Sequence, residues 1–215
     1  MAVIFKDRID AGNKLANLLK SFKGKENVVI CGIPRGGVVL AAEVAEHLLA
    51  PLKVIVAKKI GYPGNPEYAI GAVTSNGEPV LNEFEADMVQ ENWLKNEIRK
   101  VREIALSRAE KYGEFSNLDL ISDKSSVIIV DDGIATGYTV MASVEEVKKH
   151  NPREIIVAVP VIPVENAEKL ERDGVEVVAI NREKAYKGAV GAYYYNFGQT
   201  EDQEVENILS NFKSN

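Results

Sequence analysis

Residues 127–139, VIIVDDGIATGYT, combine a buried strand, an acidic loop and the start of a helix. The four apolar residues that open this stretch are typical of a strand covered on both faces. Asp131 and Asp132 follow where the strand ends, and two neighbouring carboxylates there need cationic or hydroxyl partners. Free N–H groups at a helix start favour phosphate. The loop therefore suits a ribose 5-phosphate, with hydroxyls on the carboxylates and phosphate at the helix.

The helix end of this loop carries the groups that a phosphate needs. Gly137 lets the backbone approach a ligand closely, and the hydroxyls of Thr136 and Thr139 add donors. The alternative is a surface turn in which a threonine caps the helix. A second alternative, the acidic pair of a receiver domain, needs another Asp after the next strand, which is predicted to end at Pro160. P-loop and dinucleotide-binding sites lack their fingerprints, because neither GxxxxGK[ST] nor GxGxxG occurs.

Short apolar runs and amphipathic stretches alternate on both sides of the loop. Uniformly apolar strands separated by helices are typical of a mostly parallel sheet covered on both faces, which is an α/β fold. Two further runs flank the turn sequence SNGE and are predicted to form a hairpin. The predicted strands are residues 28–32, 53–57, 126–130, 154–160 and 175–181, with the hairpin at 69–74 and 79–82; the predicted helices are 38–49, 84–112, 138–150, 164–172 and 201–212.

Composition and charge exclude several classes of protein. The 215 residues carry 26 Lys and Arg against 32 Asp and Glu, and this net charge of −6 argues against a general nucleic-acid-binding surface. Cys31 is the only cysteine, so no intramolecular disulfide can form. The longest uncharged apolar run, residues 155–164, is about half of a membrane span. We expect one cytoplasmic domain, residues 1–215, with neither a nucleic-acid nor a membrane partner.

Phosphate-binding groups also follow other predicted strands, where an open parallel sheet binds its ligands. The sequence IPRGG, residues 33–37, follows the first strand; Gly36 and Gly37 expose backbone N–H groups, and Arg35 supplies a fork of donors. The alternative is a tight turn with a solvated arginine. Lys58 and Lys59 are expected at the end of the second strand.

The acidic stretch resembles the 5-phosphoribosyl diphosphate (PRPP) motif of type I phosphoribosyltransferases, which has four apolar residues, two acidic ones, a short spacer and TGxT. The chain is also similar to a group of phosphoribosyltransferases recognised by sequence, with IPRGG, KK(I/L)G-xPGNPExAIGAV and a terminal GAYY–F–Q–D segment, here at 33–37, 58–73 and 191–202. The resemblance implies a three-layer fold with a mostly parallel sheet of about six strands. Its core would be residues 26–181, its small hood residues 1–25 and 182–200, and its assembly a homodimer.

The resemblance also implies the roles of both loops. Ribose hydroxyls would meet the acidic pair, the 5-phosphate the loop after it, and the diphosphate the loop after the first strand. The implied catalytic residues are Asp131, Asp132, Arg35 and Lys59. The implied substrate-binding residues are Pro34, Arg35, Gly36, Gly37, Lys58, Lys59, Asp131, Asp132, Ala135, Thr136, Gly137, Tyr138 and Thr139.

The charge of PRPP determines what else the site needs. Because PRPP carries roughly five negative charges when ionised, we expect a local cluster of cations and Mg²⁺. The Mg²⁺ is expected to be held mainly by PRPP oxygens and waters, without a dedicated protein metal site. Side chains alternate along a strand, so one of Lys58 and Lys59 is expected to face the diphosphate.

The implied function is transfer of the 5-phosphoribosyl group from PRPP to an acceptor nitrogen, as in nucleobase salvage, with release of diphosphate. Ala135 stands where enzymes for 6-oxopurines carry an Asp, which argues against hypoxanthine and guanine. The alternative is a regulatory module that binds PRPP or a nucleotide without catalysis. Residues 61–67 would form either a lid or a surface loop. Five aromatic residues would either stack on a base or form the core of the hood: Tyr186, Tyr193, Tyr194, Tyr195 and Phe197.

Overall fold

A parallel sheet of five strands forms the centre of the molecule. The computed structural model describes residues 4–213, so residues 1–3 of the expected hood lie outside the described part. The strand order is β2-β1-β6-β7-β8, and every neighbouring pair is parallel. The strands are β1 (Val28–Gly32), β2 (Leu52–Val54), β6 (Ser126–Val130), β7 (Glu154–Pro163) and β8 (Glu176–Glu183).

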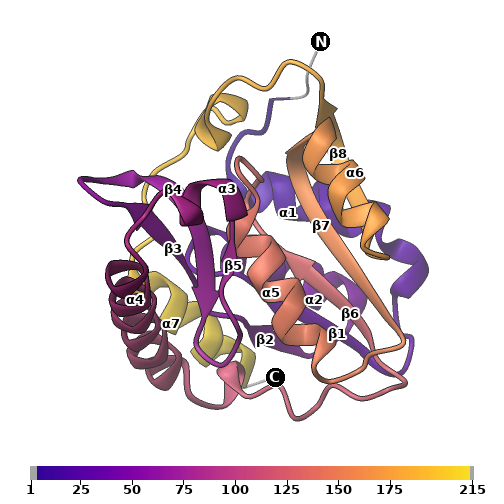
Figure 1. Cartoon of the computed structure of the whole chain (residues 1–215). Helices are drawn as coiled ribbons and strands as arrows, with labels where there is room; N and C mark the ends of the chain where they lie inside the picture. Colours follow the sequence, from indigo (N-terminus) through magenta and orange to yellow (C-terminus); the bar gives the residue numbers. More distant parts are fainter. Residues whose placement is uncertain (1–3, 214–215) are drawn as a thin grey trace.

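Helices cover both faces of this sheet (Figure 1). Alternate strand residues separate into two buried clusters: Ile30 and Ile128 pack with α1 and α2, whereas Cys31 and Ile129 pack with α5 and α6. This alternation makes each strand apolar throughout. The helices are α1 (Arg8–Leu18), α2 (Gly36–Leu48), α3 (Glu83–Asp87), α4 (Glu91–Tyr112), α5 (Tyr138–Lys148), α6 (Val164–Arg172) and α7 (Asp202–Lys213), with short 3₁₀ turns η1 (Lys20–Phe22), η2 (Gly113–Ser116) and η3 (Val190–Tyr193).

The thiol of Cys31 lies in the middle of this core. The residue is fully buried in β1, directly before the IPRGG sequence. Burial raises the pKa of the thiol to about 12.

A second, antiparallel sheet contains β3 (Ala57–Tyr62), β4 (Asn65–Thr74) and β5 (Val80–Leu81), in the order β3-β4-β5. Helix α4 packs on it through a small cluster that includes Ile60, Ile70 and Val101. Pairing of β4 with β5 confirms the hairpin predicted around SNGE. Residues 61–67 comprise the end of β3, a two-residue turn at Pro63 and Gly64, and the start of β4.

The predicted α/β class is confirmed. The predicted helices and strands differ from the observed ones mainly in where they begin and end. The main sheet has five strands where about six were expected. The predicted strand 53–57 is wrong: β2 ends at Val54, and Ile55 and Val56 cross between the two sheets while remaining buried. Burial rather than strand pairing explains their apolar character. The predicted helix 84–112 is two helices, and its predicted end at Gly113 is confirmed.

The described residues include no helix long and apolar enough to cross a membrane. The two segments expected to form a hood contact each other: Phe5 donates a backbone hydrogen bond to Tyr193 and accepts one from Tyr195. Helix α1, within the first of these segments, packs against α2 of the core. The division into core and hood therefore stays a prediction.

Candidate functional site

A cavity of about 510 Å³ opens at the carboxyl ends of β1 and β6. This is where a parallel sheet presents its loops. Most of the predicted site residues line it, although they come from three separate segments. The lining includes Pro34, Arg35, Gly36, Lys59, Asp131, Asp132, Ala135, Thr136, Gly137 and Thr139. Three predicted residues, Gly37, Lys58 and Tyr138, are not part of the lining.

The two carboxylates at the end of β6 are half-buried in the wall of the cavity. Burial raises the pKa of the Asp131 carboxyl, and the neighbouring charge of Asp132 raises it further, while Lys59 and Arg8 oppose the shift. Burial also raises the pKa of the Asp132 carboxyl, which Arg8 lowers through its charge and a hydrogen bond. The pair is therefore a strong acceptor of hydrogen bonds that lacks the water it would have at the surface.

The loop after the acid pair reaches α5 without a side-chain cap. Its N-cap residue is Gly137, whose φ of 83° lies in the left-handed region that glycine tolerates, and no described side chain caps the helix start. Within residues 4–213, the threonine cap considered as an alternative is thus absent, which leaves the first N–H groups of α5 to other partners. Asn166 of α6 anchors the loop by donating from Nδ2 to the Ala135 carbonyl at 2.6 Å.

The two glycines of IPRGG are needed for close contact between loops. A Cβ on Gly36 would collide with the Asp132 carboxylate and lie 2.6 Å from Nε of Arg8. A Cβ on Gly37 would lie 2.8 Å from the Val130 carbonyl oxygen and 2.9 Å from Oδ1 of Asp131. Both glycines therefore let the start of α2 pack directly on the acidic loop. Gly37 thus packs against the acidic loop although it does not line the cavity, and its part in the site stays a prediction.

The lysines do not end a strand of the main sheet, which corrects the expectation that they follow the second strand. Both lie within β3 of the antiparallel sheet, because the crossing at Ile55 and Val56 starts a new strand at Ala57. Lys59 lines the cavity, and its charge lowers the pKa of both aspartates. Burial lowers the pKa of Lys58, as do the positive charges of Arg108 and Arg35.

Arg35 is engaged by carboxylates of the C-terminal tail. Its Nη1 lies 3.5 Å from Oδ1 of Asp202 and 3.8 Å from Oε2 of Glu201. Arg108 of α4 approaches the same Oδ1 of Asp202 at 3.3 Å. These separations are those of loose ion pairs, so the Arg35 guanidinium remains available to a stronger anion.

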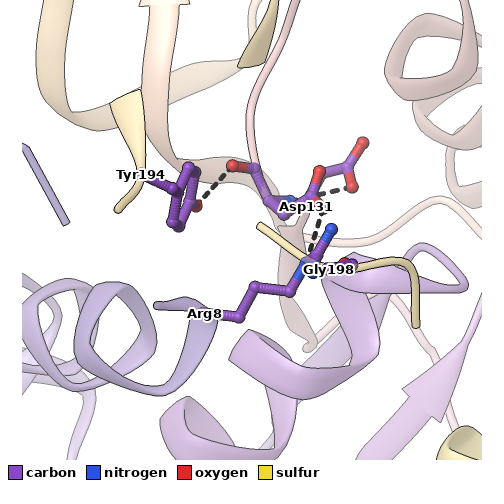
Figure 2. A network of polar contacts seen from close by, with 5 residues as sticks. Arg8, Asp131, Tyr194 and Gly198 are labelled. Atoms are coloured by element: carbon purple, nitrogen blue, oxygen red, sulfur yellow. Dashed lines mark hydrogen bonds and ion pairs between the residues drawn. The ribbon is translucent and has the colours of Figure 1, made fainter. Parts of the chain in front are cut away.

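Figure 2 shows an arginine at the acid pair, Arg8, which the sequence did not predict. Its Nε donates to Oδ2 of Asp132 at 2.8 Å, and its Nη1 donates to the Gly198 carbonyl at 2.6 Å. Tyr194 donates from Oη to the Asp132 carbonyl at 2.6 Å. A lone arginine 124 residues before its partner has no local sequence signal.

The aromatic residues of the tail mostly pack on one another. Tyr193 is fully buried and stacks on Tyr186, and Tyr194 packs between Phe5 and Phe197. Tyr193 and Tyr194 belong to the buried cluster that α1 and α2 form with the sheet, and Tyr186 and Phe197 pack against it. These four residues therefore extend the main core and do not form a separate one. Phe197 is the member of the five that lines the cavity.

Comparison with known proteins agrees with this geometry. The family model described as phosphoribosyl transferase domain matches residues 6–196, so the chain belongs to this family. It is 39% identical over 211 residues to "Putative phosphoribosyl transferase Rv0571c" of Mycobacterium tuberculosis, covering 96% of this chain and 46% of that protein. The chain thus spans about half the length of that curated relative.

A solved structure is similar over nearly the whole chain. The crystal structure of TT1426 from Thermus thermophilus matches with a TM-score of 0.79 and 40% identity, covering 98% of this chain and 99% of that one. The alignment leaves out almost none of either chain.

Proposed function

We propose that the protein transfers the 5-phosphoribosyl group of PRPP to an acceptor nitrogen and releases diphosphate. The observation that carries this proposal is one cavity that joins the acid pair, an uncapped helix start and Arg35. These three features match the hydroxyls, the 5-phosphate and the diphosphate of one molecule. A simple phosphate-binding protein would need only the helix start.

Each group would have a distinct part in the reaction. Asp131 and Asp132 would accept hydrogen bonds from the ribose hydroxyls, and residues 135–139 would bind the 5-phosphate. Arg35, Lys59 and the backbone at Gly36 would bind the diphosphate. The bond from the anomeric carbon to diphosphate would break, a bond to the acceptor nitrogen would form, and that nitrogen would lose a proton. The half-buried carboxylates would also favour positive charge developing on the ribose.

The cations in the cavity do not match the charge of the diphosphate, which supports a role for Mg²⁺. Among residues 4–213 there is no group of three or more His, Cys, Asp or Glu side chains suited to hold a metal, and Asp132 already accepts from Arg8. This donor set fits an ion bound mainly by PRPP oxygens and waters. Mg²⁺ would supply partial neutralisation of the leaving diphosphate.

The acceptor is proposed to be a nucleobase other than a 6-oxopurine, because Ala135 lacks the carboxylate that such enzymes present. The lining at Phe197 and Val190 supplies apolar surface for a flat ring. The expected setting is a cytoplasmic homodimer that binds PRPP and a small acceptor.

Calorimetry and a diphosphate-release assay together test the function. PRPP should bind in the presence of Mg²⁺, and diphosphate should be released when the right nucleobase is added. Absence of PRPP binding would exclude the proposal. Binding without release across a panel of nucleobases would instead support the regulatory module.

A Thr136→Val variant tests the phosphate loop. We expect affinity for ribose 5-phosphate to fall by about 1–3 kcal/mol, because the hydroxyl donor is lost while shape is kept. Thermal stability without ligand should be unchanged, since no described side chain caps α5. Affinity for diphosphate alone is the internal control and should stay constant. A lower melting temperature with unchanged ribose 5-phosphate affinity would contradict the assignment.

A further inference from the structure

Arg8 connects three parts of the chain at the edge of the cavity. It is the first residue of α1, directly after the N-cap Asp7, so the helix start fixes its backbone. Its guanidinium donates to Asp132 and to Gly198, and its Cζ lies 4.0 Å from the centroid of the Phe197 ring. The side chain is only 13% exposed. A surface arginine would not be held by a carboxylate, a carbonyl and a ring at once.

The surrounding chain is shaped to fit this ion pair. Gly36 leaves the space that the Asp132 carboxylate and the Nε of Arg8 occupy. Tyr194 holds the Asp132 backbone from the other side by donating to its carbonyl. The carboxylate of Asp132 is therefore fixed at its backbone and at Oδ2, which leaves Oδ1 as the acceptor for a ligand hydroxyl.

The charges around Asp132 show why a direct cation is needed there. The titratable and charged groups that act on this carboxylate are Asp131 beside it, Arg8 of α1 and Lys59 of β3, and its own charge raises the pKa of Tyr186 and Tyr194. Arg8 is in hydrogen-bond contact with it, whereas Lys59 acts through space. Two neighbouring, half-buried carboxylates without such a partner would repel each other, and each would hold a proton more readily.

We propose that Arg8 is a positioning residue for ribose recognition, which holds the Asp132 carboxylate so that it can accept a hydrogen bond from a sugar hydroxyl. The inference rests on the proposed function. Arg8 acts through Asp132, and its contacts with Gly198 and Phe197 tie the C-terminal tail to the same carboxylate. Recognition of the ribose thus depends on a segment that lies outside both sequence motifs.

Discrimination between sugars separates this role from a structural one. Affinities for ribose 5-phosphate and for its 2-deoxy and 3-deoxy analogues would be measured on wild type, Arg8→Gln and Arg8→Lys. In the wild type, at least one deoxy analogue should bind more weakly. In Arg8→Gln that preference should shrink by about 10-fold, because the carboxylate loses its charged partner. Arg8→Lys keeps the charge but not the fork or the stacking, and should retain part of the preference.

Two further variants control the experiment. Arg172→Gln makes the same change on the exposed face of α6, where Arg172 pairs loosely with Glu168, and should leave the preference intact. Phe197→Leu removes the ring beneath Arg8 and should reduce the preference without changing any charge. It also keeps the proposal testable if Arg8→Gln fails to fold.

The outcomes distinguish a failure of the proposed role of Arg8 from a failure of the proposed function. A preference that is unchanged in Arg8→Gln and Phe197→Leu, with or without a lower melting temperature, would overturn the role of Arg8. Failure of the wild type to bind ribose 5-phosphate and PRPP would instead overturn the proposed function. A preference that shrinks in Arg8→Gln and survives in part in Arg8→Lys would support the role.

Discussion

An Asp131→Asn variant should lose ligand affinity and catalysis while becoming more stable. In the proposed function this carboxylate accepts ribose hydroxyls, so affinity for ribose 5-phosphate should fall by about 1.5–3 kcal/mol. Turnover should fall further, by roughly 10²–10³-fold, as for other groups that stabilise charge in a transition state. Burial and the adjacent Asp132 raise the pKa of the Asp131 carboxyl, so its ionised form costs stability that a neutral amide avoids.

The raised pKa of Asp131 determines how the stability difference between wild type and variant changes with pH. A raised pKa in the folded state means that the folded protein binds the proton more tightly than the unfolded chain does. The ionisation cost is therefore absent below the ordinary Asp pKa of about 4 and grows as pH rises toward the folded-state value. Asp131→Asn should melt higher than wild type at neutral pH, by the equivalent of roughly 0.5–2 kcal/mol, and the gap should close in acid. A variant less stable at neutral pH would contradict this.

Arg35→Ala should weaken PRPP binding by about 1.5–3 kcal/mol, the range for hydrogen bonds to charged groups. Its loose ion pairs with Glu201 and Asp202 place the guanidinium at the cavity without satisfying it. Ribose 5-phosphate has no diphosphate, so its affinity should barely change. Calorimetry with both ligands measures the difference.

A matched control for Arg35 is Arg153→Ala. Arg153 is 58% exposed, pairs with Glu154 at the start of β7, and lies at the amino ends of the strands, opposite to the cavity. The Arg153→Ala variant should leave the affinities for PRPP and ribose 5-phosphate unchanged. An equal loss of both affinities in Arg35→Ala would show that Arg35 supports the fold or the 5-phosphate site.

The central sheet and the two loops could be predicted because each has a local cause. A strand buried on both faces must be apolar at every position, and β6 and β1 show this directly. Residues 135–139 place glycine and hydroxyl residues at a helix start, and this signal too lies within a few consecutive residues. By contrast, Ile55 and Val56 are as apolar as a strand although they only cross between sheets.

The missed parts of the site depend on contacts across the whole chain. Arg8 meets Asp132 only because α1 packs on α2 and residues 5–6 run beside residues 193–196. No spacing within the sequence marks such a pair. From the sequence, the glycines of IPRGG are predicted to bind ligand because they expose backbone N–H groups. The structure adds a steric reason, because the acidic loop occupies the space of their missing side chains.

The buried position of Cys31 makes the protein carry its own reporter of global opening. At neutral pH almost none of this thiol is ionised, because its pKa lies near 12, and the thiolate is the form that alkylating reagents and oxidants attack. Cys31 lies in β1, which pairs with β2 and β6, and the two loops that line the cavity follow β1 and β6. The rate at which this thiol is chemically labelled therefore reports how readily the central sheet opens. A ligand that contacts both loops should lower that labelling rate.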